Sequence, residues 1–167
     1  MVRSRVRVAG HAAHPMLIVF PLGLLGTAVV FDILHLLTDR GGFATTAAHL
    51  LAAGVLSGLL AAATGWADWL LAVPRGTRAR QVGLLHGLAN GAMLVLFAIS
   101  WLLRFDTADW TPSWPAIVLA WAGVVLALAS GWLGGELVER HGIGVEEDAH
   151  PDAEPSFRRG STTRTTR

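Results

Sequence analysis

Four long apolar segments, separated by short polar ones, dominate the pattern along the chain. They cover about residues 16–37, 47–73, 82–103 and 115–138. Even the shortest would form a helix of about 33 Å, which matches a bilayer hydrocarbon core of about 30 Å. Because lipid offers no partner to an open sheet edge, these segments can cross a membrane only as helices. The pattern therefore predicts an all-α membrane protein built as a bundle of four transmembrane helices.

The polar segments divide the chain into three parts. Residues 1–15 form a basic N-terminal segment, and residues 16–141 hold the four spans and their short turns. Residues 142–167 are first acidic and then rich in Ser, Thr and Arg. A segment of that composition cannot bury enough apolar surface to fold, so we expect a disordered tail.

Composition limits the classes of function. Hydrophobic residues make up 53% of the chain and charged residues only 15%, where an average soluble domain has about 25%. With a net charge of +1 and no broad basic face, neither a soluble enzyme nor a nucleic-acid-binding protein is expected. The absence of cysteine excludes thiolate metal sites and iron–sulfur clusters. No nucleophile or nucleotide-binding motif supports a conventional enzyme.

Arginine placement predicts the orientation of the bundle. Three arginines precede the first span, three lie between the second and third, and five follow the fourth, whereas Arg40 and Arg104 stand alone in the other two loops. Positive residues favour the cytoplasmic side of a membrane. Both termini and the middle loop are therefore expected in the cytoplasm.

Two features suggest an internal duplication. Residues 63–66 (Ala-Thr-Gly-Trp) of the second span resemble residues 129–132 (Ala-Ser-Gly-Trp) of the fourth, and His14 and His86 stand near the starts of the first and third spans. The chain could therefore consist of two tandem helical hairpins related by an axis along the membrane normal. Small residues recur every four positions on three spans, which favours close helix packing but would also admit the flat face of a cofactor.

Ionisable residues at membrane depth are the candidates for chemistry. Each costs about 2.5–3.5 kcal/mol at a helix centre unless it has a partner. One set, expected at the cytoplasmic level, takes a residue from every span and comprises His14, Asp68, His86 and Glu136, with Asn90 one turn after His86. A smaller set at the opposite level comprises Asp32, His35 and His49.

Three interpretations of these residues stay open. His14 and His86 could be the axial ligands of a b-type haem, with His35 and His49 at a second site. Alternatively, a divalent metal could bind His14, Asp68, His86 and Glu136. The neighbours that would orient either ligand set are Asn90, Arg78, Arg80 and Asp32. The third interpretation is structural, with Asp68 and Glu136 paired to arginines at the helix ends.

Several strings in the same order resemble a known family. They are residues 10–21, 65–68, 78–90 and 131–142, and together they resemble the bacterial membrane family catalogued as domain of unknown function 2231 over residues 11–145. The resemblance implies a four-helix protein of the bacterial inner membrane with no assigned activity. Relatives fused to electron-transfer domains imply redox work and an electron-transfer partner protein. Where relatives have a further histidine, this chain has Val19.

Two functional hypotheses follow. The first is a small redox or cofactor-binding membrane subunit that holds haem or a metal. The second is a non-enzymatic scaffold or accessory subunit in which the His and carboxylate residues are structural. Both place the chain in the lipid bilayer, allow a homo-oligomer and involve no nucleic acid. A transporter is less well supported, because the middle of the spans is almost wholly apolar.

Overall fold

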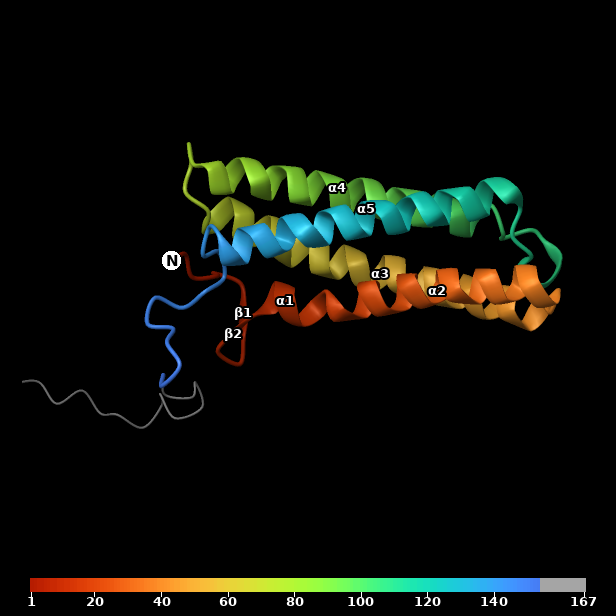
Figure 1. The fold of residues 1–167 in the computed structure, drawn as a ribbon, viewed down its shortest axis with the longest axis horizontal. Helices are drawn as coiled ribbons and strands as arrows, with labels where there is room; N and C mark the ends of the chain where they lie inside the picture. The colour runs from red at the N-terminus through yellow and green to blue at the C-terminus, as the bar shows by residue number, and fades with distance from the viewer. Residues whose placement is uncertain (154–167) are drawn as a thin grey trace, which may run out of the picture.

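Helices make up most of the computed structural model, which describes residues 1–153 (Figure 1). They are α1 (Ala13–Leu17), α2 (Val19–Thr38), α3 (Gly41–Leu71), α4 (Arg78–Leu102), the short 3-10 helix η1 (Ala108–Trp110) and α5 (Trp114–Glu139). Four helical stretches within the described residues are long and apolar enough to cross a membrane. The predicted all-α, four-helix membrane architecture is therefore confirmed.

The helix boundaries differ from the expected spans in ways that the chain explains. The first stretch begins at Ala13 and is interrupted at Ile18, between α1 and α2. Pro21 follows one turn later and cannot donate a hydrogen bond back to that turn. The second begins at Gly41 instead of residue 47, and in its first turns the hydroxyl of Thr46 donates to the carbonyl of Gly42 and that of Thr45 to the carbonyl of Asp109.

The four spans are arranged as two antiparallel hairpins. Helix α2 packs along α3, and α4 packs along α5, while the hairpins join mainly through α3 and α4. Figure 1 shows the N-terminus, the α3–α4 turn and the segment after α5 together at one end, called here the terminal end. The α2–α3 turn and the α4–α5 connection lie at the other, the loop end. This pairing agrees with the tandem hairpins suggested by the sequence.

A small β-hairpin at the terminal end was not predicted. Strands β1 (Arg7–Val8) and β2 (His11–Ala12) pair antiparallel around Ala9 and Gly10, which both have positive φ angles. Two such residues form the tight turn whose twist suits a two-residue hairpin. Residues 2–12, called the strap below, lead from this end into α1. The basic N-terminal segment is therefore ordered against the bundle.

The buried core occupies the middle and the loop-end half of the bundle. It joins both hairpins through seven residues: Leu25, Ala28, Leu51, Met93, Leu94, Phe97 and Ala120. Glycines bring the helices close enough for these contacts. A Cβ at Gly54 would lie 2.6 Å from Leu25, one at Gly58 2.5 Å from Leu94, and one at Gly123 2.7 Å from Phe97. In this half the small residues therefore serve helix packing, as expected for membrane helices.

Candidate functional site

Two histidines, one from each hairpin, are held in the same way in the terminal half. His14 on α1 donates from Nδ1 to the carbonyl oxygen of Ala61 on α3, at 2.8 Å. His86 on α4 donates from Nδ1 to the carbonyl oxygen of Ser130 on α5, at 2.9 Å. A carbonyl oxygen can only accept, so Nδ1 carries the proton and Nε2 carries the lone pair of each neutral ring.

A glycine lies against each of these rings. A Cβ at Gly65 would be 2.9 Å from the ring of His14, and one at Gly134 would be 3.2 Å from the ring of His86. In both hairpins the accepting carbonyl stands four residues before this glycine. The two hairpins therefore contain equivalent arrangements, in which Ala61 and Gly65 correspond to Ser130 and Gly134. This structural correspondence is shifted by about one helical turn from the sequence match of residues 63–66 with residues 129–132. The equivalent histidines were visible in the sequence, but their equivalent partners were not.

The two imidazole rings face each other across the boundary between the hairpins. Their centroids are 6.3 Å apart and their planes are perpendicular. Asn90, one turn after His86 on α4, places its side-chain Nδ2 3.2 Å from Nε2 of His86 and 3.0 Å from the carbonyl oxygen of His86. The predicted proximity of His86 and Asn90 is thus present as a hydrogen bond.

A cavity of about 460 Å³ surrounds the two histidines. Its lining comes from all four spans and is mostly apolar. On α5, a Cβ at Gly131 or Gly135 would meet nothing within 4 Å, so these glycines leave open space. On α4, the space beside Gly83 and Gly87 is instead occupied by the rings of Trp69 and Trp66. The small residues of this half therefore have two roles, close packing on α4 and free volume on α5.

Asp68 lies at the terminal end of this cavity and holds the strap. Its carboxylate accepts hydrogen bonds from the Ser4 hydroxyl at 2.5 Å and from the backbone N–H groups of Arg5 and Val6 at 2.7 and 2.9 Å. These three donors satisfy the charge without an arginine. The sequence identified Asp68 as a candidate ligand but not Ser4, since nothing in the basic segment indicated that it folds back.

Glu136 and the neighbouring arginines have their own contacts at the edge of the bundle. Glu136 lies 4.0 Å from Arg140, one turn later on the partly exposed surface. Arg80 donates to the carbonyl oxygens of Trp69 and Val73 and lies over the Trp69 ring. Arg78 is exposed. The structural interpretation thus fits Glu136, whereas the partners of Asp68 are not those it proposed.

The four residues proposed as a metal site are not assembled. Over residues 1–153 the structure contains no group of three or more His, Asp or Glu side chains placed to hold a metal ion. His14 and His86 are adjacent, but Asp68 is engaged by the strap and Glu136 by Arg140. The arrangement offers two imidazoles beside an apolar cavity.

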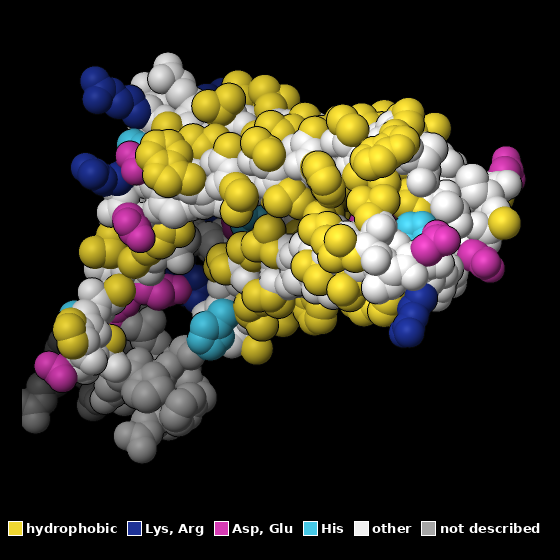
Figure 2. Space-filling model, turned by 45° about the vertical axis from the view of Figure 1, so that its right-hand side comes forward, with side chains coloured by type: hydrophobic (Ala, Val, Ile, Leu, Met, Phe, Trp, Pro, Cys, Tyr) yellow, Lys and Arg dark blue, Asp and Glu magenta, His cyan; other side chains and the backbone are white. Residues whose placement is uncertain are grey.

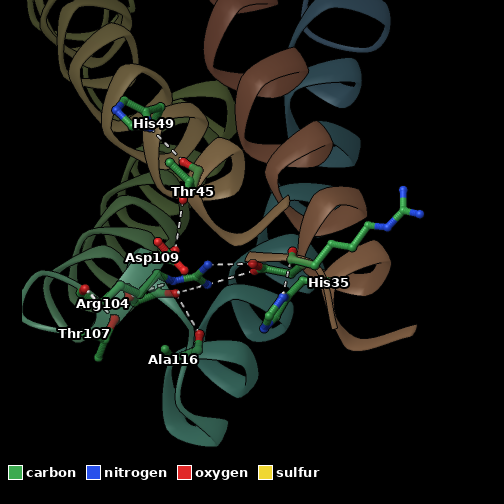
Figure 3. Close-up of polar contacts among 10 residues, drawn as sticks. His35, Thr45, His49, Arg104, Thr107, Asp109 and Ala116 are labelled. Carbon is green, nitrogen blue, oxygen red and sulfur yellow. Dashed lines mark hydrogen bonds and ion pairs between the residues drawn. The ribbon is translucent and has the colours of Figure 1, made fainter. Parts of the chain in front are cut away.

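The loop end is built around a buried ion pair. Arg104, directly after α4, reaches Asp32 on α2 through two contacts of 2.5 and 2.8 Å, and both side chains are fully buried (Figure 3). Arg104 also donates to the backbone and hydroxyl oxygens of Ser100. Paired in this way, Asp32 links the two hairpins and does not serve His35 or His49. A span carboxylate that needs a partner, with an arginine at the same depth, was the signal in the sequence.

The two histidines of the second proposed site, His35 and His49, have separate local partners, and their joint binding of a ligand stays a prediction. His35 bonds to the backbone carbonyl of Arg40, and His49 bonds to that of Thr45 one turn earlier on α3. Figure 3 shows the two rings directed at these separate carbonyls. His49 packs instead against Trp110 at a ring distance of 6.2 Å. These histidines hold local structure at the loop end.

Comparison with known proteins places the chain in a family but gives it no activity. No curated protein and no solved structure matches it. A family model matches residues 10–147, which include all four spans, both histidines of the cavity and Asp68. The chain therefore belongs to the family described as "Predicted membrane protein (DUF2231)".

Proposed function

We propose that this membrane protein is a small redox subunit that binds a b-type haem in the terminal-half cavity, with His14 and His86 as its axial ligands. The observation that carries the proposal is the matched pair of histidines, each fixed by its Nδ1–H on a backbone carbonyl and 6.3 Å apart. Such a hydrogen bond is the usual way in which a protein orients a metal-binding imidazole and leaves Nε2 for the metal. When bound, the haem would supply one-electron transfer.

The two rings are close enough to hold one group together, with their centroids 6.3 Å apart. Metal–nitrogen bonds of about 2.0–2.1 Å would bring both imidazoles within reach of a single metal ion. Two histidines on facing helices of a bundle are a common means of holding haem. Asn90 also bonds to the carbonyl of His86, so its amide retains a partner if it releases Nε2.

The cavity supports a flat apolar ligand. Its volume falls in the usual range for small-molecule sites, about 300–1,000 Å³. Gly131 and Gly135 give the α5 wall a surface without side chains, and most other lining residues are apolar. A free divalent ion is less well supported, because two imidazoles supply fewer ligands than the usual four of a zinc site.

Absorption spectroscopy tests the proposal directly. The protein purified in detergent from haem-supplied cells should show a Soret band that shifts on reduction with dithionite. His14→Ala and His86→Ala should each remove most of the bound haem, because each leaves one axial position without its ligand. His49→Ala is the matched control, since this histidine contacts only loop-end residues, and it should leave the spectrum unchanged.

Two outcomes would favour a scaffold or accessory role instead. One is a colourless protein from cells with ample haem. The other is a Soret band that persists in both cavity variants. In either case the two histidines would be helix-packing residues, and the variants would lower stability without a specific loss of function.

We also propose that the termini face the cytoplasm of a bacterium, across its inner membrane. The terminal end carries Arg3, Arg5, Arg7, Arg75, Arg78 and Arg80. At the loop end, the charge of Arg104 is cancelled by Asp32, which leaves Arg40 beside exposed Asp39, Asp106 and Asp109. Arg3 and Arg7 pair with Glu146 at the terminal end, but carboxylates contribute little to orientation, and the excess of arginines at this end favours the terminal end inside. Reporter fusions at each end of the bundle test this orientation.

An electron-transfer partner would dock at the exposed surface of the bundle.

A further inference from the structure

The cavity has two boundaries of different kinds, hydrogen-bonded backbone segments at the terminal end and helices along the side of the bundle. At the terminal end the strap and the segment after α5 contribute Val2, Ser4, Ile143 and Gly144 to the lining. The rest of the lining comes from the helices, among them Leu22 on α2 and Gly131 on α5. These boundaries decide from which solvent a ligand can arrive.

The terminal end is closed by backbone hydrogen bonds. Val2 donates to the carbonyl of Gly142 at 2.9 Å, and Gly144 donates to the carbonyl of Val2 at 2.8 Å, which links the strap to the segment after α5. Asp68 holds residues 4–6 of the strap, because it accepts from the hydroxyl of buried Ser4 and from the backbone N–H groups of Arg5 and Val6. Two separate helices are thus tied to one strand that crosses the end of the cavity.

The side of the cavity between α2 and α5 is open. Leu22 on α2 lines the cavity and is 50% exposed, and Gly131 on α5 lines it and is exposed as well. Figure 2 shows a hollow between the upper and lower apolar masses, with histidine surface visible inside it. Both helices lie within the proposed spans, so the surrounding medium at this depth is lipid.

We infer that the cavity is loaded sideways from the bilayer, through the gap between α2 and α5, while the strap seals it against water at the terminal end. The ligand is then one that dissolves in lipid, which is the chemistry of a haem. The inference rests on the proposed function for the identity of the ligand, but the two access routes can be measured without any ligand. Asp68 is the residue that keeps the strap closed.

Site-directed spin labelling separates the two routes, because the chain has no cysteine of its own. A nitroxide on Gly131→Cys reports from the cavity mouth, where a side chain meets nothing within 4 Å. Labels at Val125→Cys, which is 65% exposed on α5, and at Arg75→Cys, in the exposed α3–α4 turn, serve as lipid and water references. In lipid nanodiscs, dissolved oxygen collides with labels in lipid, and a nickel chelate collides with labels in water.

The label at residue 131 should match the Val125 reference, with high oxygen and low nickel accessibility. Combination with Asp68→Asn should raise its nickel accessibility severalfold towards the Arg75 reference, since an amide cannot accept all three strap donors. Ser4→Ala removes only one of these bonds and should give a smaller rise in the same direction. High nickel accessibility with the strap intact, or low accessibility to both reagents, would overturn the inference.

A second measurement uses the ligand itself. Gly131→Leu places a side chain in the gap and should slow the uptake of haem from preloaded vesicles several-fold. Because Gly131 also forms part of the cavity wall, the final haem content is measured beside the uptake rate, and only a slower rate relative to that content reports on the route. Gly91→Leu is the matched control, because Gly91 also has open space around its Cβ but does not line the cavity. Equal uptake rates in the two variants would refute the lateral route while leaving haem binding intact. A protein that binds no haem at all would refute the proposed function, and the spin-label result would still decide the route.

Discussion

The two halves of the bundle contain similar residue types and use them differently. At the loop end, Asp32 and Arg104 cancel each other in a fully buried pair, and Gly123 is packed against Phe97. In the terminal half, His14 and His86 each bond through Nδ1 to a backbone carbonyl beside a cavity, Nε2 of His86 bonds only to the Asn90 amide, and Gly131 and Gly135 of α5 face open space. At the loop end the polar groups pair with each other inside the packed core, whereas in the terminal half they line a cavity.

This contrast separates structural from functional polarity in a membrane protein. A buried charge whose hydrogen-bonding capacity is fully used fixes the position of two helices but cannot act on a ligand. A neutral imidazole fixed through one nitrogen keeps the other available. The function of an intramembrane polar residue therefore depends on which of its atoms lack a protein partner or can exchange it for a ligand.

The largest expected effect comes from breaking the ion pair. Asp32→Asn leaves the guanidinium of Arg104 buried without its counter-charge, and removal of one partner of a buried pair costs about 3–5 kcal/mol. The free energy of unfolding in mixed micelles measures it. Asp106→Asn, on an exposed loop aspartate, should change it little. If Asp32→Asn costs under about 1 kcal/mol, the pair does not join the hairpins.

A restoring variant sharpens the test. Asp32→Leu combined with Arg104→Met replaces the pair by apolar side chains and should recover most of the lost stability, because no charge is then buried. The haem site should be unaffected, since it lies in the other half.

The same substitution at two glycines of α5 should have opposite effects in the two halves. Gly123→Ala puts a Cβ 2.7 Å from the Phe97 ring, and overpacking of this kind costs about 1–3 kcal/mol. Gly131→Ala has open space and should be neutral or stabilise the helix by about 0.5–1 kcal/mol. Thermal unfolding of both variants in one detergent gives the comparison. Equal losses would show that the cavity wall is packed as tightly as the core.

The smallest expected effect is at Glu136. Its contact with Arg140 is 4.0 Å long and partly exposed, and helix pairs of this spacing contribute about 0.3–0.5 kcal/mol or less. Glu136→Gln should therefore leave both the unfolding midpoint and the haem spectrum close to those of the parent protein. A loss of the Soret band in this variant would contradict the site described here and return Glu136 to the ligand set.

The architecture was predictable because it depends only on the lengths and composition of continuous segments of the chain. The length of each apolar segment and the absence of any solvent for an open backbone in lipid leave only four helices. The residues of interest were predictable for the same reason, since His14, Asp32, Asp68 and His86 are costly exceptions in those segments. The family resemblance is confirmed over residues 10–147.

The partners of those residues were decided only by the tertiary structure. Which of several donors reaches Asp68 depends on the strap folding back over the bundle, and its two-residue strands are too short to give an alternating pattern. Whether a glycine is packed or faces open space depends on the side chains of other helices, since Gly123 of α5 meets Phe97 of α4 and Gly131 of the same helix meets nothing within 4 Å. The free-energy cost of a polar residue in a membrane span identifies the candidate residues from the sequence. Contacts between distant segments decide whether each one pairs within the fold or can bind a ligand.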